Sequence, residues 1–155
     1  MAAPLLTFEG NLRLFHEEFE IDVDERGDID QEGTGSPPPP LPIVTTSLLE
    51  PYEGMLVQLQ GQAVRFRGRT TLWLDDGTDP AKVVIRRSTG IRKPFVQLGA
   101  PVTAVGIASQ FSDKENPTRE DYRLLPRYAH DLIWPTTTPA EPLSDRPKFL
   151  PETGY

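Results

Sequence analysis

The chain of 155 residues contains no cysteine and only two histidines, His16 and His130. The first absence excludes disulfide bonds, thiolate chemistry and zinc sites with cysteine ligands. The two histidines lack the paired spacing of a metal site, and neither a Gly-rich phosphate loop nor a Gly-x-Ser-x-Gly motif is present. We therefore expect a non-catalytic protein without a metal or cofactor.

Long apolar runs are also absent. No stretch approaches the roughly 20 apolar residues that span a bilayer. The opening residues, "MAAPLLTFEG", have neither the basic start nor the apolar core of a signal peptide. The sequence thus predicts no membrane span and no export signal in this chain.

Proline is abundant instead: there are 17 prolines, about twice the average usage. They cluster outside the most strand-like region and divide the chain. We predict an acidic N-terminal strand extension over 1–36, a Pro-rich linker over 37–51, a folded domain over 52–134 and a Pro/Thr-rich tail over 135–155. "GSPPPPLP" favours an extended polyproline II spacer, with a ligand for aromatic-grooved domains as the rarer alternative.

Charge is distributed unevenly among these segments. Residues 1–51 hold 2 Lys and Arg against 11 Asp and Glu, a balance of −9. Residues 52–134 hold 12 against 9, a balance of +3. The net charge of −7 therefore says little about what the middle segment binds.

The apolar pattern indicates β-structure. In the acidic extension, Leu12 and Leu14 lie two residues apart, as do Phe19 and Ile21, which predicts one or two half-buried strands. From residue 54 onward, alternation predicts five strands separated by turns such as "RGR" and "DDGTDPA". Gly61 interrupts the first of these strands and predicts a bulge or bend. The order and size suit an all-β fold, a five-stranded Greek-key barrel of the OB type.

Four stretches, "YEGMLVQLQGQAV", "TLWLDDGTDPAKVVI", "QLGAPVTAVGIASQF" and "YRLLPR…HDLI", resemble the OB-fold nucleic-acid-binding superfamily. They are most similar to OB modules of large exported bacterial proteins, where these modules accompany lamin-tail or nuclease domains. The resemblance covers about residues 52–134. It implies binding of nucleic acid, but one fold hosts many tasks.

OB barrels bind single strands on the face of their second and third strands, through aromatic stacking and cations that track the phosphates. If Leu72, Leu74, Val83 and Ile85 point inward, alternation places Trp73, Lys82 and Arg86 together outside. The predicted nucleic-acid-binding residues are Trp73, Lys82, Arg86, Arg65, Arg67, Arg69, Arg87, Arg92, Lys93, Tyr122, Arg123 and Arg127.

Two alternatives apply to this surface. Trp73 can instead pack on Val84 beneath the N-terminal segment, and cations on outer strand faces commonly serve only solvation. A balance of +3 predicts that any binding to phosphates is weak and salt-sensitive. We also expect little preference for a particular base sequence. The acidic extension can also act as an internal mimic of nucleic acid, or simply be a solvated strand edge.

Two rival functions remain at this point. One is a structural or protein-interaction module of a cell-surface multidomain protein, in which the OB face packs on neighbouring domains. The other is an auxiliary domain that presents substrate to a nuclease. The partners expected are therefore nucleic acid, chiefly single-stranded DNA, or neighbouring protein domains; the sequence leaves the oligomeric state open.

A cluster of carboxylates, Asp75, Asp76 and Asp79, raises the question of a calcium loop. No bidentate glutamate follows at the twelfth position of an EF-hand loop, and Asp-Gly is ordinary hairpin chemistry. We interpret the stretch as a turn.

The chain closes on a sorting-type motif made of Leu150, Pro151, Glu152, Thr153 and Gly154. Such a signal acts in an accessible peptide that is followed by an apolar span, and the Pro/Thr-rich tail meets the first requirement. A native signal predicts a bacterial, surface-anchored protein of which this chain is a fragment. Coincidence or an engineered ligation handle are the alternatives, and these would leave a cytoplasmic location open.

Overall fold

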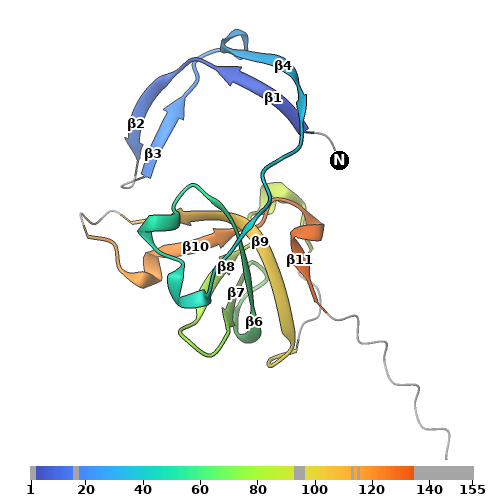
Figure 1. The fold of residues 1–155 in the computed structure, drawn as a ribbon. Helices are drawn as coiled ribbons and strands as arrows, with labels where there is room; N and C mark the ends of the chain where they lie inside the picture. Colours follow the sequence, from blue (N-terminus) through green and yellow to red (C-terminus); the bar gives the residue numbers. More distant parts are fainter. Residues whose placement is uncertain (1–2, 16–17, 93–96, 113, 115, 135–155) are drawn as a thin grey trace, which may run out of the picture.

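The computed structural model describes residues 3–15, 18–92, 97–112, 114 and 116–134. Lys93 and the sorting-type motif at 150–154 lie outside the described residues. The described chain forms a barrel and, on one side of it, a two-stranded ribbon (Figure 1).

Five strands close into the barrel, and this confirms the predicted OB-type fold. They follow the order β9-β10-β8-β7-β6, and β6 also pairs with β9 to close the ring. Only the β10–β8 contact of the ring is parallel; the others are antiparallel. The strands are β6 (Leu56–Arg67), β7 (Thr71–Asp75), β8 (Ala81–Val84), β9 (Pro101–Gln110) and β10 (Tyr122–Leu125).

Alternation along the strands fills the barrel interior. Val57 and Leu59 of β6, Leu74 of β7 and Val83 of β8 are fully buried, as is Leu124 of β10. Their neighbours along each strand point outward, which is the period of two expected for a half-buried strand. Burying one such side chain contributes about 1.5–3 kcal/mol, so these positions dominate the stability of the barrel.

The longest strand, β6, changes its hydrogen-bonding partner along its length. Its first half pairs with β9 through Gln62, and its second half pairs with β7 from Gln62 onward. Gly61 lies at this crossover, where a β-carbon would come within 2.6 Å of the carbonyl oxygen of Asp75. The pairing shifts register between Ala63 and Arg65. The predicted bend is therefore present, and it requires a residue without a side chain.

We predict that Gly61→Ala destabilises the barrel by about 1–3 kcal/mol, since the added methyl group must displace backbone rather than a flexible side chain. Thermal unfolding followed by circular dichroism measures the effect. The matched control is Gly27→Ala, because no atom lies within 4 Å of the added carbon there. Equal melting temperatures for the two variants would contradict the role assigned to Gly61.

Short elements before and after the five strands complete the barrel. Strand β5 (Leu41–Pro42) pairs with β6, and β11 (Leu132–Ile133) pairs with β9. Thr45 and Leu48, between β5 and β6, are buried. The second half of the predicted linker thus packs on the barrel, in the turns η2 (Thr45–Ser47) and η3 (Glu50–Tyr52). The packed unit begins near residue 41, earlier than the predicted boundary at 52.

The carboxylate of Asp76 fixes this segment to the β7–β8 turn. It accepts hydrogen bonds from the backbone N–H of Thr45 at 2.9 Å and from its hydroxyl at 2.7 Å. The Thr78 hydroxyl donates a third at 2.6 Å. These hydrogen bonds, the one from Thr78 first, hold the pKa of Asp76 well below its usual range against the opposing effect of desolvation.

We predict that Asp76→Asn lowers the free energy of unfolding at pH 7 by about 1 kcal/mol, because hydrogen bonds to a charged acceptor are lost. A carboxylate with a lowered pKa stabilises the fold above its unfolded-state pKa, near 4, and this stabilisation is lost as the pH falls below that value. Thermal melts from pH 7 to pH 2 should therefore show the wild type and the variant converging in acid.

The control for this experiment is Asp79→Asn in the same turn, whose exposed side chain accepts none of these bonds. A difference between wild type and Asp76→Asn that persists unchanged at pH 2 would show that the effect is not carried by the ionised carboxylate.

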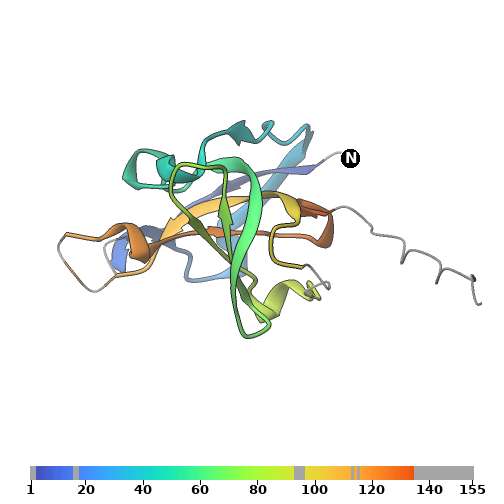
Figure 2. The same cartoon turned by 90° about the horizontal axis from the view of Figure 1, so that it is seen from below.

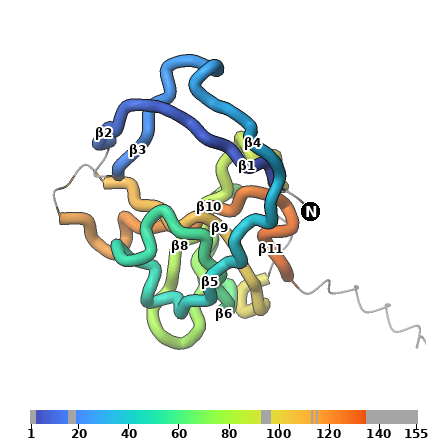
Figure 3. The backbone as a smooth tube through the Cα atoms, turned by 45° about the horizontal axis from the view of Figure 1, so that its top comes forward, coloured from blue at the N-terminus to red at the C-terminus, as the bar shows by residue number. Residues whose placement is uncertain are grey.

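The N-terminal ribbon consists of β1 (Ala3–Phe8), β2 (Asn11–Phe15), β3 (Glu18–Asp22) and β4 (Ile29–Gly35). Strand β1 pairs with β4 and β2 with β3, both antiparallel. The tube in Figure 3 shows them as one bent, two-stranded arm. Viewed at a right angle to Figure 1, the barrel lies in front of this ribbon (Figure 2). The predicted strands around Leu12 and Phe19 are present, in a ribbon of four strands where one or two were expected. They are not half-buried as predicted, because Leu12 is 68% and Phe19 is 72% exposed.

Candidate nucleic-acid interface

A row of side chains crosses the outer surface of the barrel. Arg65 of β6 lies opposite Trp73 of β7, and Trp73 lies opposite Lys82 of β8. Directly paired residues of antiparallel strands point to the same face. Because Leu72 and Leu74 are buried in the core, the three side chains lie outside it, as the alternation predicted.

The indole of Trp73 is not an open platform. Only 7% of the residue is exposed. The guanidinium of Arg65 lies 3.7 Å from the ring centroid, a cation–π contact. This corrects the expectation that Trp73 itself is open to stacking bases. Arg65 is exposed, so its guanidinium plane forms the accessible surface at this point.

Lys82 is half-buried beside this stack. Its ammonium donates a hydrogen bond to the carbonyl oxygen of Glu120. Burial lowers the pKa of Lys82, and the positive charges of Arg123 and Arg65 lower it further, against the attraction of Glu120 and Asp121. Lys82 therefore lies close enough to Arg65 and Arg123 for their positive charges to act on it.

Arg123 of β10 extends the row toward the end of β9. Its guanidinium lies 4.7 Å from the centroid of the Phe111 ring, and 49% of Phe111 is exposed. We name the row of Arg65, Trp73, Lys82, Arg123 and Phe111 the basic belt. It draws on four barrel strands, β6, β7, β8 and β10, and on the residue that directly follows β9.

The remaining predicted arginines gather toward one end of the belt or beyond it. Arg67 shares a face with Arg65, and Arg69 follows in the β6–β7 turn. The backbone N–H of Ile85 donates to the carbonyl of Thr70, which brings the start of η4 (Arg87–Thr89) next to that turn. The exposed cations there are Arg67, Arg69, Arg86 and Arg87, with Arg92 further along the chain.

Two predicted contact residues have other roles. Tyr122 is buried in the core and donates its hydroxyl to Glu50 at 2.8 Å. Burial and this acidic partner raise its pKa to about 12. Arg127 forms an ion pair with the buried carboxylate of Asp131, at 3.1 Å from its Nε. The structure thus removes Tyr122 from the predicted nucleic-acid surface, whereas Arg127 is tied to Asp131 and stays partly exposed.

Asp131 shows why Arg127 is held in place. It accepts the backbone N–H groups of Arg127 at 2.8 Å and of Tyr128 at 3.1 Å, in addition to the guanidinium. Burial acts to raise the pKa of Asp131, but the hydrogen bonds from Arg127 and Tyr128 outweigh it and lower the pKa. Arg127 thus neutralises the buried charge of Asp131, and their hydrogen bonds fix the turn that follows β10.

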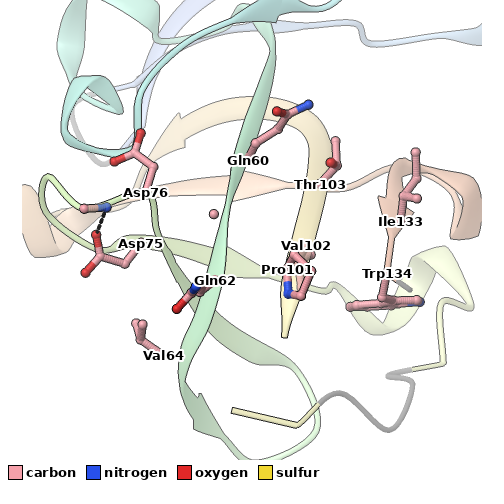
Figure 4. Close-up of a pocket in the computed structure, with 12 residues that line it drawn as sticks. Gln60, Gln62, Val64, Asp75, Asp76, Pro101, Val102, Thr103, Ile133 and Trp134 are labelled. Atoms are coloured by element: carbon pink, nitrogen blue, oxygen red, sulfur yellow. Dashed lines mark hydrogen bonds between the residues drawn. The ribbon is translucent and has the colours of Figure 1, made fainter. Parts of the chain in front are cut away.

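An open groove of about 800 Å³ lies along β6 toward β9 and β11 (Figure 4). Among the described residues that line it are Gln60, Gln62, Asp75 and Trp134, but no lysine, arginine or histidine. Two carboxylates, those of Asp75 and Asp76, border it. A polyanion would be repelled here, so the groove is a poorer candidate for phosphate than the basic belt. Sequence reasoning missed Trp134, which directly follows the last short strand.

Two carboxylates of the β7–β8 turn accept hydrogen bonds from groups of this chain. Asp75 accepts the backbone N–H of Gly77 at 2.8 Å, and Asp76 binds Thr45 and Thr78 as described. In the part of the chain that the structure describes, no three metal-binding side chains come together. Over the same residues, no helix has the length and apolar character needed to cross a bilayer.

No protein-family model matches this chain, and no curated protein matches it in sequence. The proposed function therefore rests on the fold and on the geometry of the belt. The resemblance to OB modules of exported bacterial proteins stays a prediction.

Proposed function

We propose that the barrel binds single-stranded nucleic acid through the basic belt, weakly and with little sequence preference. The observation that supports this most is a row of two cation–aromatic contacts, Arg65 on Trp73 and Arg123 on Phe111, with Lys82 directly paired to Trp73 between them. Cations beside aromatic rings on the outer face of an OB-type barrel are the chemistry that single strands require.

The phosphates are expected to contact Lys82 and Arg65. Each lies near other cations, so the unliganded belt carries mutual repulsion that an arriving anion relieves. Arg67, Arg69 and Arg86 continue the positive surface from the end of β6 and the β6–β7 turn to the residues after β8. Binding of this kind weakens steeply as the salt concentration rises.

The bases are expected to stack on the exposed guanidinium plane of Arg65 and on the Phe111 ring. Arginine planes and aromatic rings both accept stacked bases, and each stacked base contributes about 1–3 kcal/mol. Trp73 then acts as a positioning residue, because its ring fixes the plane of Arg65 from below. Stacking reads no base edge, which accounts for the low sequence preference.

We predict that Lys82→Gln weakens binding of fluorescein-labelled oligo-dT by about 3- to 10-fold and reduces the slope of log K against log salt by about 1. The reason is the loss of one phosphate contact. Fluorescence anisotropy between 20 and 200 mM salt measures both quantities. The matched control is Arg26→Gln, which removes an exposed charge from the N-terminal ribbon, outside the belt, and should leave affinity close to the wild-type value.

Arg65→Lys separates stacking from charge, because lysine keeps the positive charge and lacks the guanidinium plane. It should weaken binding more than Arg26→Gln and increase solvent quenching of Trp73 fluorescence, since the guanidinium no longer covers the indole. No anisotropy change for the wild type up to about 0.1 mM protein at low salt would overturn the proposed function, as that concentration exceeds the non-specific dissociation constants of DNA-binding proteins.

A further inference from the structure

The outer half of the N-terminal ribbon is amphipathic. Across β2 and β3, Leu12 lies opposite Ile21 and Leu14 lies opposite Phe19, so all four side chains share one face. They are 51–72% exposed. The opposite face carries polar pairs such as Arg13 with Glu20, and Arg13 also forms an ion pair with Asp22 at 2.7 Å.

The inner half of the ribbon has an apolar face as well. Phe8 lies opposite Ile29, and Leu6, two residues before Phe8, points to the same side. These three side chains are 43–50% exposed. The reverse side of this half carries the pair of Thr7 and Asp30.

This ribbon lacks a core of its own. No described residue between 3 and 36 is buried. A two-stranded sheet without a covering layer is at best marginally stable in water, and monomeric proteins rarely leave such a continuous apolar patch open. The apolar face therefore requires a partner layer.

We propose that the partner is the ribbon of a second copy of this chain, packed face to face in a symmetric dimer. The apolar faces of the two halves suit a second copy of themselves: their seven large side chains are all apolar, and the paired positions Leu12, Leu14, Phe19 and Ile21 include no charge that would need an opposite charge across the interface. Residues 1–36 contain 10 Asp and Glu against 2 Arg, and the charged cross-strand pairs lie on the reverse face. Two acidic ribbons can therefore pack without bringing those charges together.

The available area is sufficient. A phenylalanine buries about 150–250 Å² when fully covered, and leucine and isoleucine bury less, so the seven roughly half-exposed side chains offer at most about 100 Å² each. Two fully covered ribbons then bury up to about 1,400 Å², above the roughly 1,000 Å² that a specific interface needs. The result is a small β-sandwich with one layer from each copy, about 10 Å apart. Because the contact is isologous, assembly stops at two copies.

The test is the mass of the full chain in solution, measured by light scattering after size exclusion over a dilution series. We expect a concentration-dependent species of twice the 17.3 kDa chain mass. Phe19→Lys should shift it to the monomer, because a charge on the apolar face cannot be buried unpaired. The matched control, Thr7→Lys, adds the same charge to the reverse face beside Asp30 and should leave the dimer intact.

A second measurement on the wild-type chain guards against a variant that simply fails to fold. In a mixture of isotope-labelled and unlabelled protein, filtered nuclear Overhauser spectra should give intermolecular contacts among Leu12, Leu14, Phe19 and Ile21. A monomer at every concentration, a dimer that survives Phe19→Lys, intermolecular contacts on the barrel instead, or open-ended assembly beyond two copies would each overturn the proposal.

Discussion

The whole barrel depends on one constraint: β6 must pair with β9 along its first half and with β7 along its second. The strand therefore bends where the two sets of partners meet, and the backbone of Asp75 leaves no room for a side chain at Gly61. Closure through β6 and β9 lets alternation decide which side chains are inside and which are outside. The basic belt is the outward half of that alternation on β6, β7 and β8, so the candidate site is a consequence of how the ring closes.

Much of this follows from the sequence because strand alternation is a local property. The apolar spacing of Leu72 and Leu74 suffices to place Trp73 on the outer side, and Gly61 signals the bend. The same parity argument, applied to "YRLL", would have turned Tyr122 inward together with Leu124, as the structure shows. Arg127 and Asp131 are four residues apart, a spacing that signals an ion pair across a turn but not that the aspartate is buried. The cover over Trp73 had no such local signal. It arises from cross-strand pairing of Arg65 with Trp73, just beyond the register shift at Ala63.

The linker illustrates a different limit of sequence reasoning. Its prolines correctly indicate an extended chain, yet the segment after Pro40 adds strand β5 and buries Thr45 and Leu48. What ties it down is the carboxylate of Asp76, some thirty residues away in sequence. Composition reports local conformational preference, whereas burial of a polar threonine depends on a distant acceptor that satisfies its hydrogen bonds. The packed unit therefore begins earlier in the chain than the prolines alone predict, because these tertiary contacts include residues from about 41 onward.

Barrel and ribbon carry opposite charge, and this gives the proposed dimer a consequence for binding. If the barrel binds single strands as proposed, a balance of +3 makes the binding by one copy weak. Two barrels joined through their ribbons would then present two belts to the same polyanion, so the second contact would be intramolecular and avidity would rise without any new residue in the site. The acidic reverse faces of the ribbons would meanwhile repel a strand from the dimer centre and confine it to the belts. On this reasoning, the apolar face of the ribbon and the basic belt act together: the first sets the number of weak sites in the assembly, and the second sets the strength of each.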